Sequence, residues 1–431
     1  MKRRVLLLLL QIVVIFTTFV IFISAKNLND DYDWLAIDGF VYKVFVLFLV
    51  LILLFVAEIL KFGQLDKGWE YAKLYWSIII KLEEELINAG IYNENLWWAS
   101  PPTIKLSVSA DLTTGILKIR NSVRLNKRLD DFDLSAALGI YKVERHYLSN
   151  DANYYIYELL RADKSFRMIF ENRTDFNNYA ARCGTYQLFL DSRTTCNLQH
   201  TLIVGQTGSG KTYALFSLIL QMLNKPIQYH LYFIDPKGAS VDVLGQNLFP
   251  NRTVSEFDDI MAMLETFVSE MANRKAEMHN NLGSYNKLDA DYTYFNLSPH
   301  ILLIDEYAAF MAVVNSKSKG IRDHVNELMS QIVLMGRQLG FFAFIVMQKS
   351  DATLISTALR DNLPLKIVLG NAEPTTYETT FGKSVDIPPL NYLQGDGVFT
   401  EPTLANTPKL VQFPTLNFDI LEAAKMSAGV W

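Results

Sequence analysis

Four residues in the middle of the chain have the types and spacing needed to hold a phosphate chain. Gly205 is followed, after four residues, by Gly210, Lys211 and Thr212, so the pattern GxxxxGK[ST] is complete. Glycines let successive backbone N–H groups turn toward a phosphate, and the N-terminus of the next helix adds the positive end of its dipole. In such a loop we expect Lys211 to reach the β- and γ-phosphates and the Thr212 hydroxyl to hold Mg²⁺. The sequence therefore predicts a site for ATP and Mg²⁺.

The residues on either side of this motif agree with that prediction. The apolar run Thr201–Val204 precedes it, and Tyr213–Leu223, rich in Leu, Ile, Ala and Met, indicates a helix after it. The alternative is a chance glycine-rich turn, which requires no strand before it and no helix after it. The expected phosphate-binding residues are Gly205, Gln206, Thr207, Gly208, Ser209, Gly210, Lys211 and Thr212.

A second motif is an apolar run that ends in two carboxylates. Ile301–Ile304 is followed directly by Asp305 and Glu306, which is a Walker B pattern. We expect Asp305 to hold the Mg²⁺ ion and Glu306 to polarise the attacking water as general base. Many buried strands end in acids, so the pattern alone is weak and a purely structural Asp-Glu pair is the alternative. Its occurrence after a complete phosphate-binding loop favours the catalytic interpretation.

Two further strand ends carry polar residues. Gln348 follows the apolar run Phe344–Met347. In NTPases with a Walker B glutamate, a polar residue on the strand between the two motif strands commonly senses the γ-phosphate, so Gln348 is the candidate, with an ordinary strand-end glutamine as the alternative. Asp235–Gly238 closes another strand at the same expected edge of the sheet, where ligands gather in open α/β folds. Its role stays open between a nucleotide contact, a subunit contact and a turn.

Phosphoryl transfer usually requires an additional positive charge as the transition state develops, and in ring ATPases a neighbouring subunit often supplies it. Arg337, Arg360 and Lys366 are the candidates in the second half of the expected motor. An ordinary surface salt bridge is the more conservative interpretation of each residue taken singly. We expect one of the three to act in trans.

The pattern from residue 200 onward predicts an α/β fold. Apolar strand candidates alternate with helical patterns, which favours a parallel sheet covered by helices on both faces. One helix is marked by Leu264, Phe267, Val268 and Met271, which recur at i, i+3, i+4 and i+7. The strand candidates are residues 201–204, 230–234, 301–304, 342–347 and 365–369.

The N-terminal region predicts two membrane spans. Val5–Ala25 contains no charged residue and is long enough to cross a hydrocarbon core of about 30 Å. A cleaved signal peptide is the alternative, but the apolar stretch is too long for one and no small-x-small cleavage site ends it. A second apolar run, Val44–Ala57, follows after the acidic loop 26–40. Because basic residues flank the other ends, the positive-inside rule predicts a multi-pass protein of the cell membrane with both termini and the motor in the cytoplasm.

Changes in sequence character along the chain suggest five segments. Short β-rich runs between the double proline at 101–102 and residue 197 predict a small α+β domain before the motor. The expected segments are a transmembrane hairpin at 1–61 with helices at about 5–25 and 42–60, a juxtamembrane helical segment at 62–100, the small α+β domain at 101–197, the ATPase motor at 198–412 and a tail at 413–431.

The net charge and the cysteine content limit the kinds of binding site that the chain can have. The formal net charge is −5, so any contact with nucleic acid must come from local patches and not from bulk charge. One such patch is Lys317–Arg322, a basic, glycine-containing stretch soon after the Walker B strand, with an ordinary solvated loop as the equal alternative. Cys183 and Cys196 fit neither a disulfide framework nor a metal site.

Taken in order, these motifs resemble the FtsK/SpoIIIE family of DNA translocases. The resemblance covers about residues 185–400. The variant Leu359–Pro364, the small preceding domain and the expected hairpin look most like the TcpA-like coupling proteins of Gram-positive conjugative plasmids and integrative conjugative elements. The matching residues are Gly205–Thr212, Leu303–Ala308, Gly336–Gly340, Met347–Gln348, Arg360–Ile367 and Gly395–Gly397.

The resemblance implies a RecA-like motor that forms a homohexameric ring and threads DNA in a sequence-tolerant way with the energy of ATP hydrolysis. In the conjugative branch such a motor delivers the DNA–relaxase complex to channel proteins of the membrane. By residue, the resemblance implies phosphate binding by Gly205–Thr212, Mg²⁺ binding by Asp305, water activation by Glu306 and γ-phosphate sensing by Gln348.

Departures from the family pattern bear on the choice of function. Chromosomal relatives usually carry four membrane spans, a long linker and a C-terminal winged-helix module, none of which this sequence shows, so conjugation is favoured over chromosome partitioning. Lys366 stands where many of those relatives carry arginine. A protein-export ATPase of the type VII secretion kind usually has several motor domains, whereas one P-loop is seen here. The intact set of Lys211, Asp305 and Glu306 argues against a nucleotide-gated scaffold that does not hydrolyse ATP, since such a scaffold has no need for a catalytic carboxylate.

Overall fold

A computed structural model describes most of the chain as two units defined by their contacts. One unit comprises Met1–Tyr141 and Tyr147–Glu158, and the other comprises Lys142–His146 and Leu159–Trp431. The described residues are 2–31, 38–94, 99–125, 128–129, 132, 134–282, 290–350, 355–383, 385, 387–388 and 390–429.

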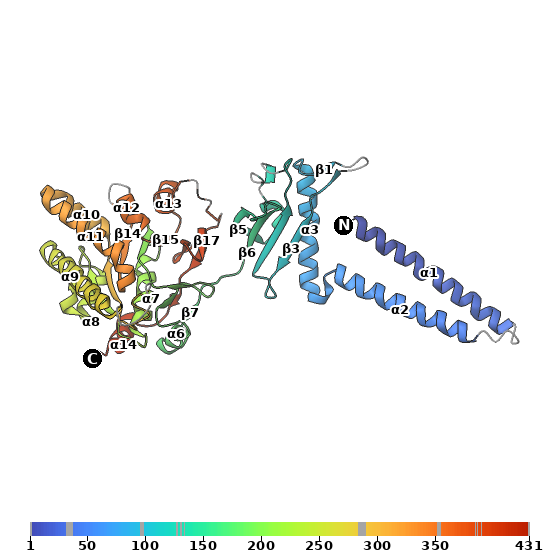
Figure 1. Ribbon diagram of the computed structural model, residues 1–431, viewed down its shortest axis with the longest axis horizontal. Coiled ribbons are helices and arrows are strands. Elements are labelled where there is room, and N and C mark those ends of the chain that lie inside the picture. Colours follow the sequence, from blue (N-terminus) through green and yellow to red (C-terminus); the bar gives the residue numbers. More distant parts are fainter. Residues whose placement is uncertain are drawn as a thin grey trace. The chain divides into compact units, whose positions relative to one another are not determined.

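The first unit begins with two long helices, α1 (Lys2–Asp31) and α2 (Asp38–Phe62), which lie side by side (Figure 1). Aromatic side chains of the two helices pack against each other. The ring centroids of Phe19 and Phe48 are 5.4 Å apart, and those of Phe22 and Phe45 are 5.3 Å apart. The helices therefore form a hairpin, as the sequence predicts.

The membrane role expected for this hairpin is not supported. A span requires about 20 consecutive, predominantly apolar residues. Along the part of the chain that the structure describes, no helix combines the length and the apolar character needed to cross a membrane. By this finding the prediction of a multi-pass membrane protein with a lipid bilayer as partner is wrong. The expected acidic loop lies partly outside the described residues, at 32–37.

The rest of the first unit is a helix and a small antiparallel sheet. Helix α3 buries Leu82 and Leu86 completely, and it lies within the helical segment expected at 62–100. The four-stranded sheet has the order β3-β4-β6-β5, and three of its strands contain the β-rich runs of the sequence. The elements are η2 (Leu65–Lys67), α3 (Trp69–Asn88), β1 (Asn93–Glu94), β2 (Ala99–Ser100), β3 (Ile104–Val108), β4 (Thr114–Arg120), α5 (Ser135–Leu138), β5 (Tyr141–Leu148) and β6 (Tyr154–Arg161).

The second unit is built on an eight-stranded sheet of order β12-β11-β13-β14-β10-β15-β16-β17. The first six strands in this order run parallel, and β16 and β17 extend the edge as antiparallel strands. All five strand predictions are confirmed. The strands are β10 (Thr201–Gly205), β11 (His230–Ile234), β12 (Thr253–Val254), β13 (His300–Ile304), β14 (Phe341–Met347), β15 (Leu365–Leu369), β16 (Asp396–Glu401) and β17 (Ala405–Gln412).

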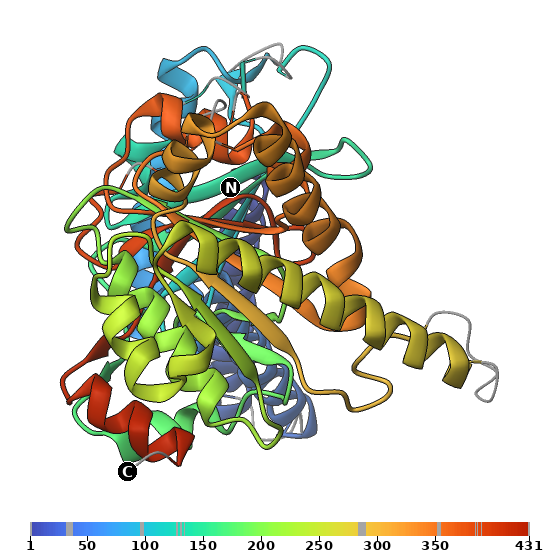
Figure 2. The ribbon, with the colours of Figure 1, turned by 90° about the vertical axis from the view of Figure 1, so that its left-hand side faces the viewer.

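Helices cover both faces of this sheet (Figure 2). Because neighbouring residues of a strand point to opposite faces, Ile203 joins the core under one helix layer, whereas Leu202 and Val204 join the core under the other. Burial on both sides explains why these strands read as continuous apolar runs. One layer holds α7 (Lys211–Leu223), α8 (Ser240–Leu248) and α14 (Ile420–Ala428), and the other holds α9 (Phe257–Leu282), α10 (Tyr307–Ser316) and α11 (Lys319–Leu339). Shorter helices are η3 (Pro250–Arg252), α12 (Thr357–Asp361) and α13 (Pro374–Phe381). The α/β prediction is confirmed.

Segments on both sides of the expected motor pack with it. Strand β18 (Thr415–Leu416) pairs in parallel with β7 (Ile169–Phe170), although the two strands lie far apart in the sequence. The Gln221 side chain on α7 accepts from Phe189 N at 2.8 Å and donates to Phe189 O at 3.0 Å. The structure thus groups residues 159–197 and 413–429 with the motor, which differs from the expected boundaries at 197/198 and 412/413. The added elements are β7 (Ile169–Phe170), α6 (Arg173–Ala180), β8 (Gln187–Phe189), β9 (Thr195–Asn197) and β18 (Thr415–Leu416).

Truncation of Phe176 tests whether residues 159–197 belong to the core of the motor. The Phe176 ring is fully buried and lies 5.2 Å from the Phe170 ring and 6.1 Å from the Phe418 ring. Phe176→Ala should lower the free energy of unfolding of the second unit by about 3–5 kcal/mol, as expected for a buried phenylalanine. Urea unfolding followed by circular dichroism measures this change. The control is Ile169→Ala, since Ile169 is 62% exposed; equal effects of the two variants would refute the assignment.

Candidate active site

Polar residues of four strand ends meet at one edge of the large sheet. Because β10, β11, β13 and β14 are parallel, their carboxyl ends lie on the same side. These ends carry Gly205, Asp235, the Asp305–Glu306 pair and Gln348. Strand β14 lies between β10 and β13, which is the position expected for the strand that carries Gln348.

The glycine-rich loop between β10 and α7 has the backbone conformation that its glycines permit. Gly208 and Gly210 have φ values of 82° and 96°, in the left-handed region that other residues rarely adopt. A Cβ atom at Gly210 would lie 2.7 Å from Gly395 N, and Gly395 N itself donates to Ser209 O at 2.8 Å. The first turn of α7 leaves backbone N–H groups without intrahelical acceptors at this loop. The loop therefore fits a chain of phosphates.

Lys211 begins α7, and its ammonium group is turned back onto the loop. Lys211 Nζ donates to Gly205 O and, at 3.1 Å, to Gln206 O. Burial lowers the pKa of Lys211, while Glu306 and Asp305 act in the opposite direction. Lys211 thus lies close enough to Asp305 and Glu306 to interact with their charges. This is the position expected of a lysine that would pair with the phosphates of a bound nucleotide.

The acidic groups at this edge fit a divalent cation. Asp305 lies next to Glu306 and close to the buried carboxylate of Asp235. Burial and the two neighbouring carboxylates raise the pKa of Asp305 to about 6. A cation bound here would relieve the repulsion among the carboxylates of Asp235, Asp305 and Glu306. Carboxylate and hydroxyl oxygens are the ligands that Mg²⁺ prefers. Thr212, half-buried in the first turn of α7, supplies the hydroxyl.

Glu306 is held in an unusual conformation. It is 8% exposed and has a φ of 52°, in the left-handed region, directly before α10. Its Oε2 accepts from Lys237 Nζ at 3.1 Å, and its Oε1 accepts from Gln348 N at 3.4 Å. The structure therefore brings Glu306 and Gln348 together. It also adds Lys237, which the sequence placed at this edge without a defined role.

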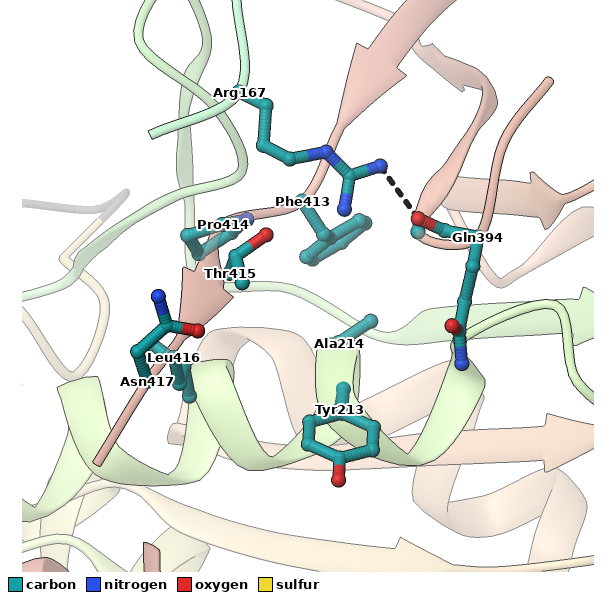
Figure 3. Close-up of a pocket in the computed structure, with 11 residues that line it drawn as sticks. Arg167, Tyr213, Ala214, Gln394, Phe413, Pro414, Thr415, Leu416 and Asn417 are labelled. Atoms are coloured by element: carbon teal, nitrogen blue, oxygen red, sulfur yellow. Dashed lines mark hydrogen bonds between the residues drawn. The ribbon is translucent and has the colours of Figure 1, made fainter. Parts of the chain in front are cut away.

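A cavity of about 310 Å³ opens beside the phosphate loop (Figure 3). Arg167 reaches over it, and the Arg167 guanidinium donates to Gln394 O and, at 2.6 Å, to Asp396 Oδ1. The lining residues are Arg167, Gly210, Tyr213, Ala214, Gln394, Gly395, Phe413, Pro414, Thr415, Leu416 and Asn417. Apart from Gly210 and Gly395, no sequence motif marks these residues, because they come from four separate segments that only the folded chain brings together.

Within the described residues, no hydrogen bond or ion pair joins the three candidates for a trans-acting charge to Gly205–Thr212 of their own chain. Arg337 is exposed near the C-terminus of α11, which leads into the amino end of β14 and so lies at the opposite edge of the sheet. Arg360 Nη1 donates to Thr379 O at 2.9 Å. Lys366 lies on β15, and burial lowers its pKa.

The basic stretch Lys317–Arg322 is mostly helix and not a loop. Helix α11 begins at Lys319, with Ser318 at its N-cap, so only the residues before it form a connection. Lys317 Nζ lies 4.5 Å from the centroid of the Phe257 ring, and Arg322 Nη1 donates to Lys317 O at 3.3 Å. A contact of this stretch with DNA stays a prediction.

Comparison with known proteins finds similarity over part of the chain, including the glycine-rich loop. Residues 185–286 match the FtsK/SpoIIIE family, a segment that includes the glycine-rich loop. The Ftsk domain-containing protein YdcQ of Bacillus subtilis is 30% identical over 221 residues, which cover 50% of this chain and 44% of that protein. The DNA translocase FtsK of Staphylococcus aureus is 26% identical over 200 residues, which cover 43% of this chain and 24% of that protein. The chain thus spans less than half the length of these relatives.

Among solved structures, the chain is similar to the pCW3 conjugation coupling protein TcpA in its monomer form with ATPγS. The sequence identity is 16% and the TM-score is 0.49, with 76% of this chain and 94% of that chain covered. The second unit has the fold of an α/β P-loop ATPase, and the segment 185–286 within it matches the FtsK/SpoIIIE family.

Proposed function

We propose that this protein is an ATP-driven DNA translocase that acts as a coupling protein in conjugative DNA transfer. The observation that carries the proposal is the meeting of the glycine-rich loop, Asp305, Glu306 and Gln348 at one sheet edge within an FtsK/SpoIIIE family domain. The conjugative setting is supported by the variant Leu359–Pro364 and by the small α+β unit before the motor.

In the proposed reaction the residues Gly205–Thr212 bind the phosphates of ATP, and Lys211 leaves the loop carbonyls to pair with the β- and γ-phosphates. Thr212 and Asp305 would hold Mg²⁺, which neutralises the charge that develops on the phosphate oxygens. Glu306 accepts the proton of the attacking water, and Gln348 senses the γ-phosphate next to it.

The cavity beside the loop takes the base and the ribose. It adjoins Gly210 and Tyr213, so a nucleotide whose phosphates follow the loop would place its other end there. The exposed Tyr213 offers a ring face to a purine, and Arg167 and Gln394 offer polar groups at the same cavity. ATP is therefore the proposed substrate, and Mg²⁺ its cofactor.

Assembly into a ring would complete the site. We propose a homohexamer in which Arg337, Arg360 or Lys366 of one subunit approaches the γ-phosphate bound by the next, because none of the three is placed at the loop of its own chain. The DNA path would run past basic side chains such as Lys319, giving sequence-tolerant, salt-dependent binding. A relaxase and channel proteins are the proposed partners in transfer.

The test is ATP hydrolysis by the full chain with and without DNA, single-stranded and double-stranded. Translocation predicts hydrolysis that rises several-fold with DNA and loses this rise as salt is added. Hydrolysis that is indifferent to DNA would contradict the proposal and favour protein export. Nucleotide binding without hydrolysis would contradict it and favour a nucleotide-gated scaffold.

A further inference from the structure

We propose that Lys237 is a positioning residue that fixes the Glu306 carboxylate at the edge of the sheet for water activation. The inference rests on the proposed ATPase function, because it gives a role to a residue that acts through the proposed general base. Its basis is the ion pair between Lys237 Nζ and Glu306 Oε2, 3.1 Å long, between the ends of two adjacent strands.

The loop that carries Lys237 is built around a buried carboxylate. Asp235 is fully buried at the end of β11, and its side chain accepts from Lys237 N at 3.0 Å, Ala239 N at 2.9 Å and Asp242 N at 3.2 Å. Gly238 follows with a φ of 59°, which a glycine adopts without strain. These bonds fix the backbone of Lys237, so the direction of its side chain is set by the fold.

Glu306 needs such a partner for two reasons. Its left-handed backbone is unfavourable for a residue with a side chain, so its conformation must be held by its surroundings. Its side chain is 11% exposed, and a carboxylate removed from water requires charged or hydrogen-bonding partners. Within the described residues, the hydrogen-bond partners of this carboxylate are Lys237 Nζ and the more distant Gln348 N. Of these two partners, Lys237 is the one that carries a positive charge.

Lys237 and Lys211 reach the acidic pair from different strands. Strand β11 is separated from β10 by β13 and β14, so Lys237 pairs with Glu306 from the β11 side, and its charge is close enough to Lys211 to contribute to the lowered pKa of that lysine. A lysine placed there orients the base and does not replace Lys211 as the phosphate ligand. Loss of Lys237 should therefore change the rate of the chemical step and leave nucleotide binding in place.

The test is Lys237→Met in the full chain, which keeps the aliphatic stem and removes the charge. We expect kcat for ATP to fall at least tenfold, with KM within twofold of the unsubstituted protein and an unchanged melting temperature. Lys237→Arg should recover most of the rate. In the Glu306→Gln background, Lys237→Met should have no further effect, because the two residues act as a unit.

The matched control is Lys349→Met. Lys349 pairs with Glu373 at 2.7 Å just after the end of β14, and both side chains are more than half exposed. This variant should hydrolyse ATP at the unsubstituted rate. An unchanged kcat in Lys237→Met would overturn the proposal. So would a raised KM at constant kcat, which indicates a phosphate ligand, or a loss of rate that adds to that of Glu306→Gln.

A measurement without nucleotide separates this inference from the proposed function. Lysines are reductively methylated with ¹³C-formaldehyde, which preserves their charge, and the Lys237 resonance is assigned from its absence in Lys237→Met. The resonance should shift in Glu306→Gln, whereas that of Lys349 should not. An unshifted Lys237 resonance would overturn the ion pair. If the unsubstituted chain hydrolyses no ATP, the proposed function fails. The shift of the Lys237 resonance in Glu306→Gln still shows whether Glu306 and Lys237 form an ion pair.

Discussion

Replacement of Lys211 with alanine is expected to reduce the kcat for ATP by about 10²–10³, the range for losing a preorganised donor to transition-state charge. The physical reason is the position of the ammonium group, which lies within the glycine-rich loop and in the field of Asp305 and Glu306. Affinity for ATP should also weaken by about tenfold or more, because the same charge pairs with the phosphates in the ground state. Steady-state hydrolysis and titration with a fluorescent ATP analogue measure the two effects.

Lys225→Ala is a matched control for this variant. Lys225 follows the other end of α7 and, like Lys211, is half-buried and donates to two backbone carbonyls, Cys183 O at 3.5 Å and Gly184 O at 3.0 Å. Burial lowers the pKa of both lysines. Lys225→Ala should therefore reproduce any general effect of removing such a lysine while ATP binding is retained. Equal losses of ATP binding in the two variants would contradict the assignment of Lys211.

Glu306→Gln is expected to reduce kcat by about 10²–10⁴, the contribution typical of a positioned general base, while ATP remains bound. Glutamine keeps the shape of the side chain but cannot take a proton from water at neutral pH. The protein should therefore accumulate bound, unhydrolysed ATP, which rapid filtration and quantification of retained nucleotide would detect.

Glu373→Gln supplies the control for the change of a carboxylate to an amide. Glu373 pairs with Lys349 and is exposed, so its replacement should leave hydrolysis unchanged. Hydrolysis by Glu306→Gln at the unsubstituted rate would show that another group activates the water, and Asp305 would then be the next residue to test.

The parts of the fold that were predictable from sequence are those with strong local patterns. Strands β10, β11, β13, β14 and β15 are almost entirely buried on both faces, so each consists mainly of apolar residues. The glycine-rich loop is recognisable because its conformation at Gly208 and Gly210 excludes most other residues. Since parallel strands share an edge, the order of these motifs also predicts that Asp305, Glu306 and Gln348 meet.

The features that escaped prediction depend on distant contacts. The pairing of β18 with β7 involves two residues in each strand, which leaves no periodicity to detect. The cavity beside the loop needs that pairing to bring Arg167 near Gln394 and Phe413. The ion pair between Lys237 and Glu306 depends on the adjacency of β11 and β13, which no local pattern specifies. The hairpin was read correctly as two helices, but its assignment to a membrane was not supported.

The central claim is that ATP hydrolysis moves this protein along DNA. Displacement of streptavidin from the biotinylated end of single- and double-stranded DNA measures such movement directly, with the full chain and saturating ATP. We expect ATP-dependent release from at least one of these substrates, and no release with Glu306→Gln. Hydrolysis that DNA stimulates, without release of streptavidin from any end of either substrate, would contradict the claim.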